Sequence, residues 1–286
     1  MNHIKSWISA MGMGLFLAAC GEVTEPDASS CDLAADTQET ATVNATGCHV
    51  LSRDTQACEA ERKAQGLSGY WLKFSCRVTL SSVGSAQIVR AQADGQPDYK
   101  SFYFSTTNAC HEEYSGATRN PNTLAAQSYV LDFPVTPNTT PQSMARIAVV
   151  GLALNGVPIF GNFAAPGDDI YTEARTFDRC GAHPNGTGKY HYHSEPYALS
   201  YDDSNFIGVM RDGYPIYGRK DADGSAPTLD TYGGHTGVTA DSPTRPVYHY
   251  HVNEQTSPHP GTQGQKQWFL TTGSFRGTPA ACASCN

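Results

Sequence analysis

The chain has 286 residues, a net charge of −8 and 16% charged side chains. Basic residues do not cluster along it, which argues against nucleic acid as a partner. With 27 glycines and 17 prolines, the composition is typical of a turn-rich β protein and not of a helical one.

The first 19 residues resemble a lipoprotein signal peptide. Their apolar stretch from Ile8 to Ala19 is too short to span a bilayer stably. It ends in Leu17-Ala-Ala-Cys20, which resembles the bacterial lipobox, so we expect Cys20 to carry a lipid. The alternative is an ordinary secretory signal. Lipidation would place the protein in the bacterial cell envelope with the membrane as its partner, and Gly21 indicates the outer membrane in Gram-negative cells.

Residues 20–45 lack a hydrophobic period and are predicted to be a flexible tether. Residues 46–97 are expected to be a cysteine-containing β extension of the main domain, with one helix between Arg53 and Gly66. Segments 69–80 and 98–104 are rich in β-branched and aromatic residues, so we predict strands there. Val130–Pro137 is predicted to be an edge strand, because its prolines have no backbone N–H to donate to a neighbouring strand.

The cysteines predict disulfide bonds. Besides Cys20 the chain has an even number, which is typical of bridges in an oxidising compartment: Cys31, Cys48, Cys58, Cys76, Cys110, Cys180, Cys282 and Cys285. Their connectivity stays open at this point. Cys282 and Cys285 have redox-motif spacing, but without a βαβ context we predict a structural bridge.

Three short sequence motifs, here called phrases, occur twice in the same order. Asn155-Gly-Val-Pro-Ile-Phe-Gly161 matches Asp212-Gly-Tyr-Pro-Ile-Tyr-Gly218, and Asp178-Arg-Cys-Gly-Ala-His183 matches Asp230-Thr-Tyr-Gly-Gly-His235. Tyr190-His-Tyr-His193 matches Tyr248-His-Tyr-His251. These matches indicate an internal duplication over about 147–193 and 206–251. The apolar segments before Asn-Gly and Asp-Gly are predicted to form one β-hairpin in each repeat.

The histidines at repeated positions are candidate metal ligands. Residues i and i+2 of a strand share a face, so each Tyr-His-Tyr-His presents two imidazoles together. A third histidine from the Asp-x-x-Gly-x-His phrase could complete one site per repeat. Alternatively, paired strands could pool four histidines at a pseudo-twofold axis, or the alternation could be a cross-strand ladder without metal. The candidates are His183, His191, His193, His235, His249 and His251. The histidines outside the repeats, His49, His111 and His259, are expected at the surface.

Asp178 and Asp230 have two possible roles. Each could orient a histidine by accepting its distal N–H, or cap the turn at the following glycine. Cys180 could be a thiolate ligand, but its counterpart is Tyr232, which favours a disulfide. Asp221-Ala-Asp-Gly224 begins like a calcium loop, but Tyr232 stands where the last ligand belongs, so we predict a turn.

The doubled Tyr-His-Tyr-His and its preceding phrases resemble the YHYH domain family of secreted and lipid-anchored proteins. Further phrases also resemble that family: Ala164-Ala-Pro-Gly167, Thr176-Phe-Asp178 and Gly273-Ser-Phe-Arg-Gly277. The resemblance spans about residues 98–277 and leaves 278–286 as a C-terminal tail. It implies the domain but no particular activity.

We predict a mainly β fold with little helix, in which duplicated hairpin units form a sandwich- or barrel-like domain. Imidazole ligands favour copper or zinc, and the lack of paired carboxylates argues against calcium or magnesium. The leading hypothesis is an extracytoplasmic lipid-anchored protein with a histidine-rich transition-metal site. One alternative is a hydrolytic or oxidative metalloenzyme that uses His183, His191 and His193, with Asp178 as orienting group or base. Another is a metal-free β module that contacts a glycan or a protein partner.

Overall fold

The computed structural model describes residue 48 and residues 53–85, 87–113, 118–145, 147–165, 168–282 and 285. The predicted signal peptide, Cys20 and the tether over 20–45 lie outside this part of the chain. Within it, no helix combines the length and the apolar character needed to cross a membrane.

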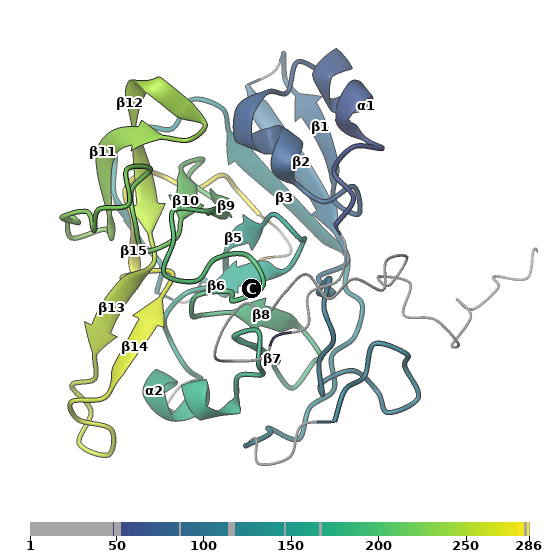
Figure 1. The fold of residues 1–286 in the computed structure, drawn as a ribbon, viewed down its shortest axis with the longest axis vertical. Helices are drawn as coiled ribbons and strands as arrows, with labels where there is room; N and C mark the ends of the chain where they lie inside the picture. Colours follow the sequence, from purple (N-terminus) through teal and green to yellow (C-terminus); the bar gives the residue numbers. More distant parts are fainter. Residues whose placement is uncertain are drawn as a thin grey trace, which may run out of the picture.

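An eight-stranded sheet forms the centre of the molecule, in the order β11-β12-β10-β9-β5-β6-β8-β7 (Figure 1). The strands of the first repeat are β5 (Val149–Ala153), β6 (Pro158–Phe160), β7 (Ala182–Pro184) and β8 (Tyr190–Tyr192). Those of the second repeat are β9 (Phe206–Met210), β10 (Pro215–Tyr217), β11 (Gly234–Thr239) and β12 (Ser242–His251).

The strand order shows the duplication directly. Each repeat contributes four consecutive strands of the sheet, paired antiparallel, parallel and antiparallel in the same sequence. The repeats meet where β5 and β9 pair, and Leu152 lies opposite its own sequence counterpart, Val209. A pseudo-twofold axis therefore passes through this pair, and each Tyr-His-Tyr-His lies away from it toward one end of the sheet.

Both predicted hairpins are present, and their turns have the same form. Gly156 and Gly213 have φ angles of 91° and 92°, whereas Asn155 and Asp212 do not have positive φ. Ala153 accepts a hydrogen bond from the N–H of Gly156 and donates its own N–H to Val157. Each connection is thus a type I turn followed by a glycine bulge, not a turn with two positive φ angles.

A three-stranded sheet packs beside the second repeat (Figure 1) and consists of β1 (Thr79–Val83), β2 (Ile88–Ala93) and β3 (Tyr129–Pro134). The edge position predicted for the Val130–Pro137 segment is confirmed, since β3 is the last strand of this sheet. The predicted helix is α1 (Glu59–Ala64).

The strand predicted over 69–80 is wrong for its first part, where a 3-10 helix, η2 (Gly69–Lys73), is found. Tyr70 stacks on Phe206 and the next residue, Trp71, packs against Phe133. Both rings face the core, which successive residues of a strand cannot do, because their side chains point to opposite faces. Tertiary packing therefore overrides the β propensity here.

The strand predicted over 98–104 is also absent from the described structure. This segment contributes only isolated bridge residues, Tyr99 and Ser101, and Ser101 bridges to His111. Phe102, Tyr103 and Phe104 are all buried in succession. Such continuous burial is incompatible with a half-exposed strand, and the aromatic residues fill the space beside β8 as irregular chain.

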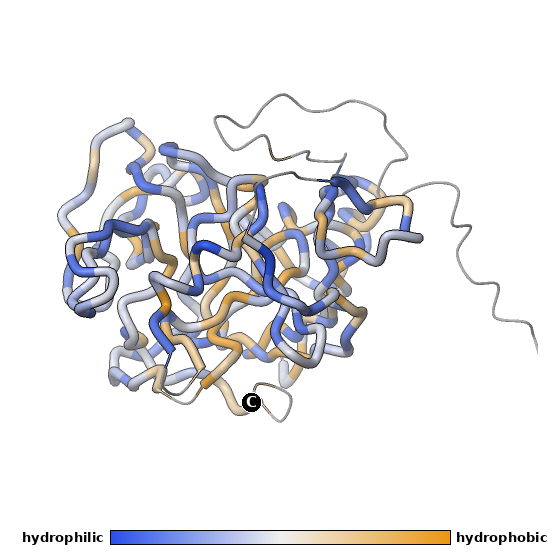
Figure 2. Tube along the Cα trace, turned by 90° about the horizontal axis from the view of Figure 1, so that it is seen from below, coloured by the Kyte–Doolittle hydropathy of each residue, from blue (hydrophilic) through white to orange (hydrophobic). Residues whose placement is uncertain are grey.

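The remaining elements are short. They are β4 (Gln142–Ser143), α2 (Ile170–Glu173), η3 (Ala174–Thr176), β13 (Asn253–Thr256), β14 (Lys266–Phe269) and β15 (Ser274–Phe275). Figure 2 shows apolar segments gathered in the interior and hydrophilic ones at the periphery. The prediction of a mainly β fold with little helix is confirmed. The main sheet has free ends at β11 and β7, so it does not close into a barrel.

Three disulfides lie wholly within the described residues: Cys48–Cys180, Cys58–Cys76 and Cys282–Cys285. Cys110 is disulfide-bonded as well. The structural bridge at the C-x-x-C sequence is therefore confirmed, and so is the disulfide role of Cys180. The Cys48–Cys180 bridge ties the beginning of the described chain to the Asp-x-x-Gly-x-His phrase of the first repeat.

Candidate metal centres

The first candidate centre is built on the β7–β8 pair. His183 lies directly opposite His191 in the antiparallel register, and His193 follows at the end of β8. The ligand atoms of the three histidines all lie within 4.8 Å of one another. The structure therefore brings the three candidates of one repeat together, and does not pool four histidines at the pseudo-twofold axis.

Backbone carbonyls set the tautomers of two of these rings. His191 Nδ1 lies 2.8 Å from the carbonyl oxygen of Lys189, and His193 Nδ1 lies 2.5 Å from that of Gly161. A carbonyl oxygen only accepts, so each Nδ1 must carry the hydrogen. Each neutral ring therefore directs the Nε2 lone pair into the cluster, which is the usual arrangement behind a metal-ligating histidine.

The hydroxyl of Thr176 sets the tautomer of the third ring, that of His183. The Thr176 hydroxyl donates to the carbonyl oxygen of Glu173 at 2.7 Å, so it accepts from Nδ1 of His183, which is 2.8 Å away. The Asn120 amide lies farther from this Nδ1, at 3.4 Å, and donates to the Pro184 carbonyl at 2.8 Å. Nε2 of His183 is buried and has no hydrogen-bond partner among the described residues. Such an orphaned buried polar atom is rare and is accounted for by an ion or a water.

The first cluster is enclosed by aromatic side chains. Phe160 stacks on His191 with 3.9 Å between ring centroids, and Phe177 packs edge-on against His183 and parallel to His193. The three histidines are only 1–3% exposed. Burial lowers the pKa of His183 and His191 well below the usual value and that of His193 to about 4. All three rings are therefore neutral near pH 7, as ligands must be.

A bound cation would suit neutral rings in this geometry. Nε2 of His191 lies 2.9 Å from Nε2 of His193, although both nitrogens carry lone pairs. A proton shared between them would require one imidazolium, which burial disfavours. A metal ion near the three Nε2 atoms would remove this repulsion and also satisfy His183.

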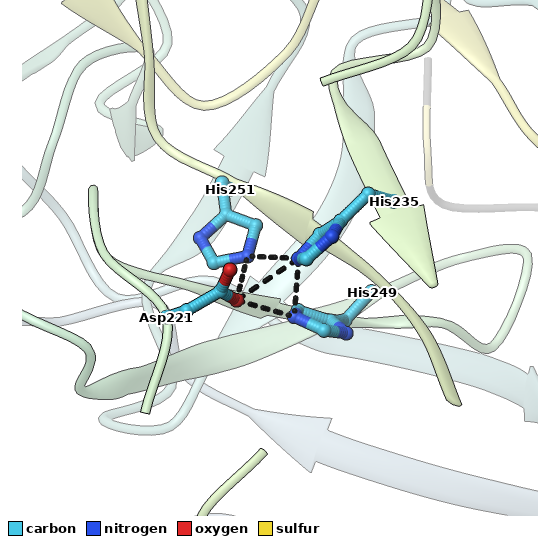
Figure 3. A group of neighbouring side chains, drawn as sticks. All are labelled: Asp221, His235, His249 and His251. Carbon is cyan, nitrogen blue, oxygen red and sulfur yellow. Dashed lines mark hydrogen bonds and ion pairs between the residues drawn. The ribbon is translucent and has the colours of Figure 1, made fainter. Parts of the chain in front are cut away.

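The second candidate centre repeats this construction on β11 and β12. His235 lies opposite His249, and His251 follows two residues later. The Nδ1 atoms of His249 and His251 lie 2.9 and 2.7 Å from the carbonyl oxygens of Val247 and Gly218. Their Nε2 atoms lie 3.1 and 3.2 Å from Nε2 of His235 (Figure 3).

Asp221 supplies a fourth donor that the repeated motifs do not reveal. Its Oδ1 lies 2.9 Å from Nε2 of His235 and 3.5 Å from Nε2 of both His249 and His251 (Figure 3). The predicted turn is present, with the N–H of Gly224 bonded to the Asp221 carbonyl, and this turn aims the carboxylate at the histidines. Repetition could not reveal Asp221, because its counterpart three residues after Gly161 is Ala164.

The donor spacing of the second centre fits a tetrahedral ion. Donors placed about 2.0–2.1 Å from zinc at tetrahedral corners lie about 3.3 Å apart. Five of the six separations among Oδ1 of Asp221 and the three histidine Nε2 atoms run from 2.9 to 3.5 Å. The sixth, between His249 and His251, is within 4.8 Å. Three imidazoles and one carboxylate are therefore arranged as a four-ligand set.

The two repeated aspartates have the structural role. Asp178 accepts hydrogen bonds from the backbone N–H groups of Cys180 and Ala182 at 3.0 and 3.3 Å, and from the hydroxyls of Ser101 and Tyr190. These bonds cap the turn before His183, and none of them involves a histidine.

Asp230 repeats this arrangement at the surface. It accepts from the N–H groups of Tyr232 and Gly234, and from the hydroxyl of Tyr248 at 3.0 Å. The first tyrosine of each motif is thus held by the aspartate of the preceding phrase.

The second tyrosine of each motif is held by the hairpin turn. The Tyr192 hydroxyl accepts from the Asn155 side chain at 3.1 Å, and the Tyr250 hydroxyl donates to Asp212 at 2.6 Å. Within each Tyr-His-Tyr-His, the tyrosines therefore anchor the strand to the two other repeated phrases and the histidines form the centre. This division explains why the three phrases recur together.

The longer loop of the second repeat does not disturb its centre. Thirteen residues separate His235 from His249, against seven between His183 and His191. The additional residues extend the β11–β12 hairpin outward, and the two histidine pairs keep the same register.

The other two histidines of the described residues, His111 and His259, do not join these clusters. His259 is half exposed, as predicted, and His49 lies outside the described residues. The surface prediction is wrong for His111, whose side chain is 9% exposed and bonds to the Phe104 carbonyl. A cavity of about 570 Å³ between η2 and the second repeat is lined by aromatic residues, including Tyr70 and Tyr214, and by no histidine.

The half-buried carboxyl of Glu173, near the first centre, provides a pH prediction. Burial, reinforced by Asp168, raises the pKa of Glu173 from 4.5 to about 7. The folded state thus holds this proton more tightly than the unfolded chain, so the contribution to stability is complete below pH 4.5 and is lost as the pH rises through 7. Glu173→Gln removes this loss.

Between pH 5 and pH 8, we expect the free energy of unfolding of Glu173→Gln to rise by about 1 kcal/mol relative to that of the wild type, after allowance for solvent screening. Urea unfolding at both pH values measures the difference. Equal effects of the substitution at both pH values would show that Glu173 does not titrate in this range.

Comparison with known proteins assigns a family to part of the chain. Residues 128–228 match the family model described as YHYH protein. The matched segment includes the first centre and the β9–β10 hairpin, and ends before His235. No curated protein and no solved structure matches the chain. The part of the chain that builds the first centre is therefore a YHYH domain.

Proposed function

We propose that this protein is an extracytoplasmic, lipid-anchored metal-binding protein whose two repeats each hold one transition-metal ion. The observation that carries the proposal is the convergence of the histidine Nε2 atoms. In both clusters the Nδ1 atoms of the two Tyr-His-Tyr-His histidines donate to backbone carbonyls, so their Nε2 lone pairs point into the cluster. These Nε2 atoms lie 2.9 Å apart in the first cluster, and 3.1 and 3.2 Å from Nε2 of His235 in the second. Copper and zinc are the ions that imidazole ligands suit best.

Metal analysis tests the proposal. Tag-free protein is expected to retain one ion per cluster after dialysis. Elemental mass spectrometry measures the metal content. Replacing His191 and His193 together by alanine should halve the metal content, and replacing His249 and His251 should do the same. His259→Ala is the matched control, because this exposed histidine lies outside both clusters. Wild-type protein that binds neither copper nor zinc would refute the proposal.

The envelope location is supported by two features. Leu17-Ala-Ala-Cys20 resembles a lipobox, and disulfides are typical of oxidising compartments. We expect Cys20→Ala to move the protein from the membrane fraction to the soluble fraction, because the proposed anchor is the lipid on this cysteine. Immunoblots of fractionated cells measure this shift. Persistent membrane association of the variant would contradict lipid anchoring at Cys20.

The metalloenzyme alternative receives less support. Asp178, its candidate base, is engaged by two hydroxyls and two backbone N–H groups and not by the histidines. The first cluster is also almost completely buried. A substrate would have to displace Phe160 or Phe177 to reach an ion bound there.

A further inference from the structure

We infer that the two centres hold different ions: Zn²⁺ at the second centre, with Asp221 as its fourth ligand, and Cu⁺ at the first centre, with three histidines. This inference rests on the proposed function and adds to it the identity of each ion. It follows from a difference in charge, donor number and burial between two centres that otherwise share their construction.

The second centre suits a dication. Its carboxylate offsets one of the two charges of Zn²⁺ and completes four donors at tetrahedral spacing. The side chains of Asp221 and His235 are 19% and 20% exposed, so water also stabilises the remaining charge. Four protein donors and a closed coordination sphere are the features of structural zinc sites.

The first centre has no carboxylate in its ligand group. Ala164 stands where the second repeat has Asp221, so three neutral imidazoles would have to hold the ion alone. The cost of burying an ion rises with the square of its charge, so a dication costs about four times as much as a monocation in the same medium. The near-complete burial of His183, His191 and His193 therefore disfavours Zn²⁺.

Aromatic packing also favours Cu⁺ over Zn²⁺ at the first centre. Phe160 and Phe177 lie against the rings of the cluster, where a water would be needed as the fourth ligand of Zn²⁺. Cu⁺ carries one charge, binds imidazole nitrogen and is satisfied by three donors. The first centre therefore supplies the three neutral nitrogen donors that suit Cu⁺. It lacks the carboxylate and the fourth ligand that Zn²⁺ would need.

A matched pair of variants tests this inference. His183 and His235 are counterparts, and glutamine at either position removes one imidazole while keeping a polar side chain. Zn²⁺ binding is measured against a chromophoric chelator, and Cu⁺ binding anaerobically against a Cu⁺-specific chelator. His235→Gln is expected to weaken Zn²⁺ binding about 100-fold and leave Cu⁺ binding unchanged, and His183→Gln is expected to do the reverse.

Two further measurements do not depend on the folding of His183→Gln. Asp221→Asn, an isosteric change, should weaken Zn²⁺ binding and spare Cu⁺ binding. Wild-type protein titrated with Co²⁺, which mimics zinc, should show the tetrahedral absorption spectrum for one equivalent only. Two equivalents of tetrahedral Co²⁺, or Zn²⁺ bound equally by both centres, would overturn this inference and leave the proposed function intact. Failure of the wild type to bind any of these ions would overturn both.

Discussion

We expect Asp178→Ala to lower the free energy of unfolding by about 3 to 5 kcal/mol, the range for removing a buried, multiply bonded charge. Asp178 is buried and accepts from the hydroxyls of Ser101 and Tyr190 and from two backbone N–H groups. The substitution would leave these donors unpaired in the interior. Urea denaturation at pH 7 measures the change.

The duplication provides the control. Asp230 makes the same bonds to its turn and to Tyr248, but it is exposed, so water can replace the lost partners. We expect Asp230→Ala to cost less than about 1 kcal/mol. Equal losses of unfolding free energy in the two variants would mean that burial does not determine how much these aspartate hydrogen bonds stabilise the fold.

The second large effect concerns the Cys48–Cys180 disulfide. Its cysteines are 132 residues apart, and long loops gain most from closure. Replacing both by alanine is expected to lower the free energy of unfolding by about 2 to 5 kcal/mol. Since Cys180 lies in the turn between Asp178 and His183, we also expect weaker metal binding at the first centre.

The Cys58–Cys76 disulfide closes a loop of only 18 residues and lies away from both centres, so it is the matched control. Its removal should cost about 2 kcal/mol less, because the loop-closure entropy is smaller, and should leave metal content unchanged. Thermal unfolding and metal analysis of both variants separate the two effects. Loss of metal only in the Cys58–Cys76 variant would contradict the role assigned to Cys180.

Much of the site could be predicted from sequence because the chain carries two copies of it. The alternation of Tyr190-His-Tyr-His193 placed two imidazoles on one strand face, since side-chain direction in a strand has a period of two. Repetition then separated the six histidines of the phrases from the other four in the chain. The same comparison found the hairpins, because Asn-Gly and Asp-Gly determine turns locally.

Sequence comparison could not choose between the roles of Asp178 and Asp230. Capping a turn and orienting an imidazole require the same residue at the same spacing, and only the distances in the folded chain distinguish them. The aromatic segments at Tyr70 and Phe102 were assigned to strands for a related reason. Their β propensity is real, but packing against residues far along the chain determined their conformation.

By itself, the sequence determined the duplicated β architecture and the six candidate histidines, because both follow from local periodicity. Only the tertiary structure decided that each repeat builds its own centre, since that depends on β7 and β11 pairing with β8 and β12. It also decided that Asp221 lies beside the three histidines of the second cluster and that Phe160 and Phe177 lie against the first. Charge and exposure at a site depend on residues brought in from elsewhere in the chain, and a local pattern does not contain them.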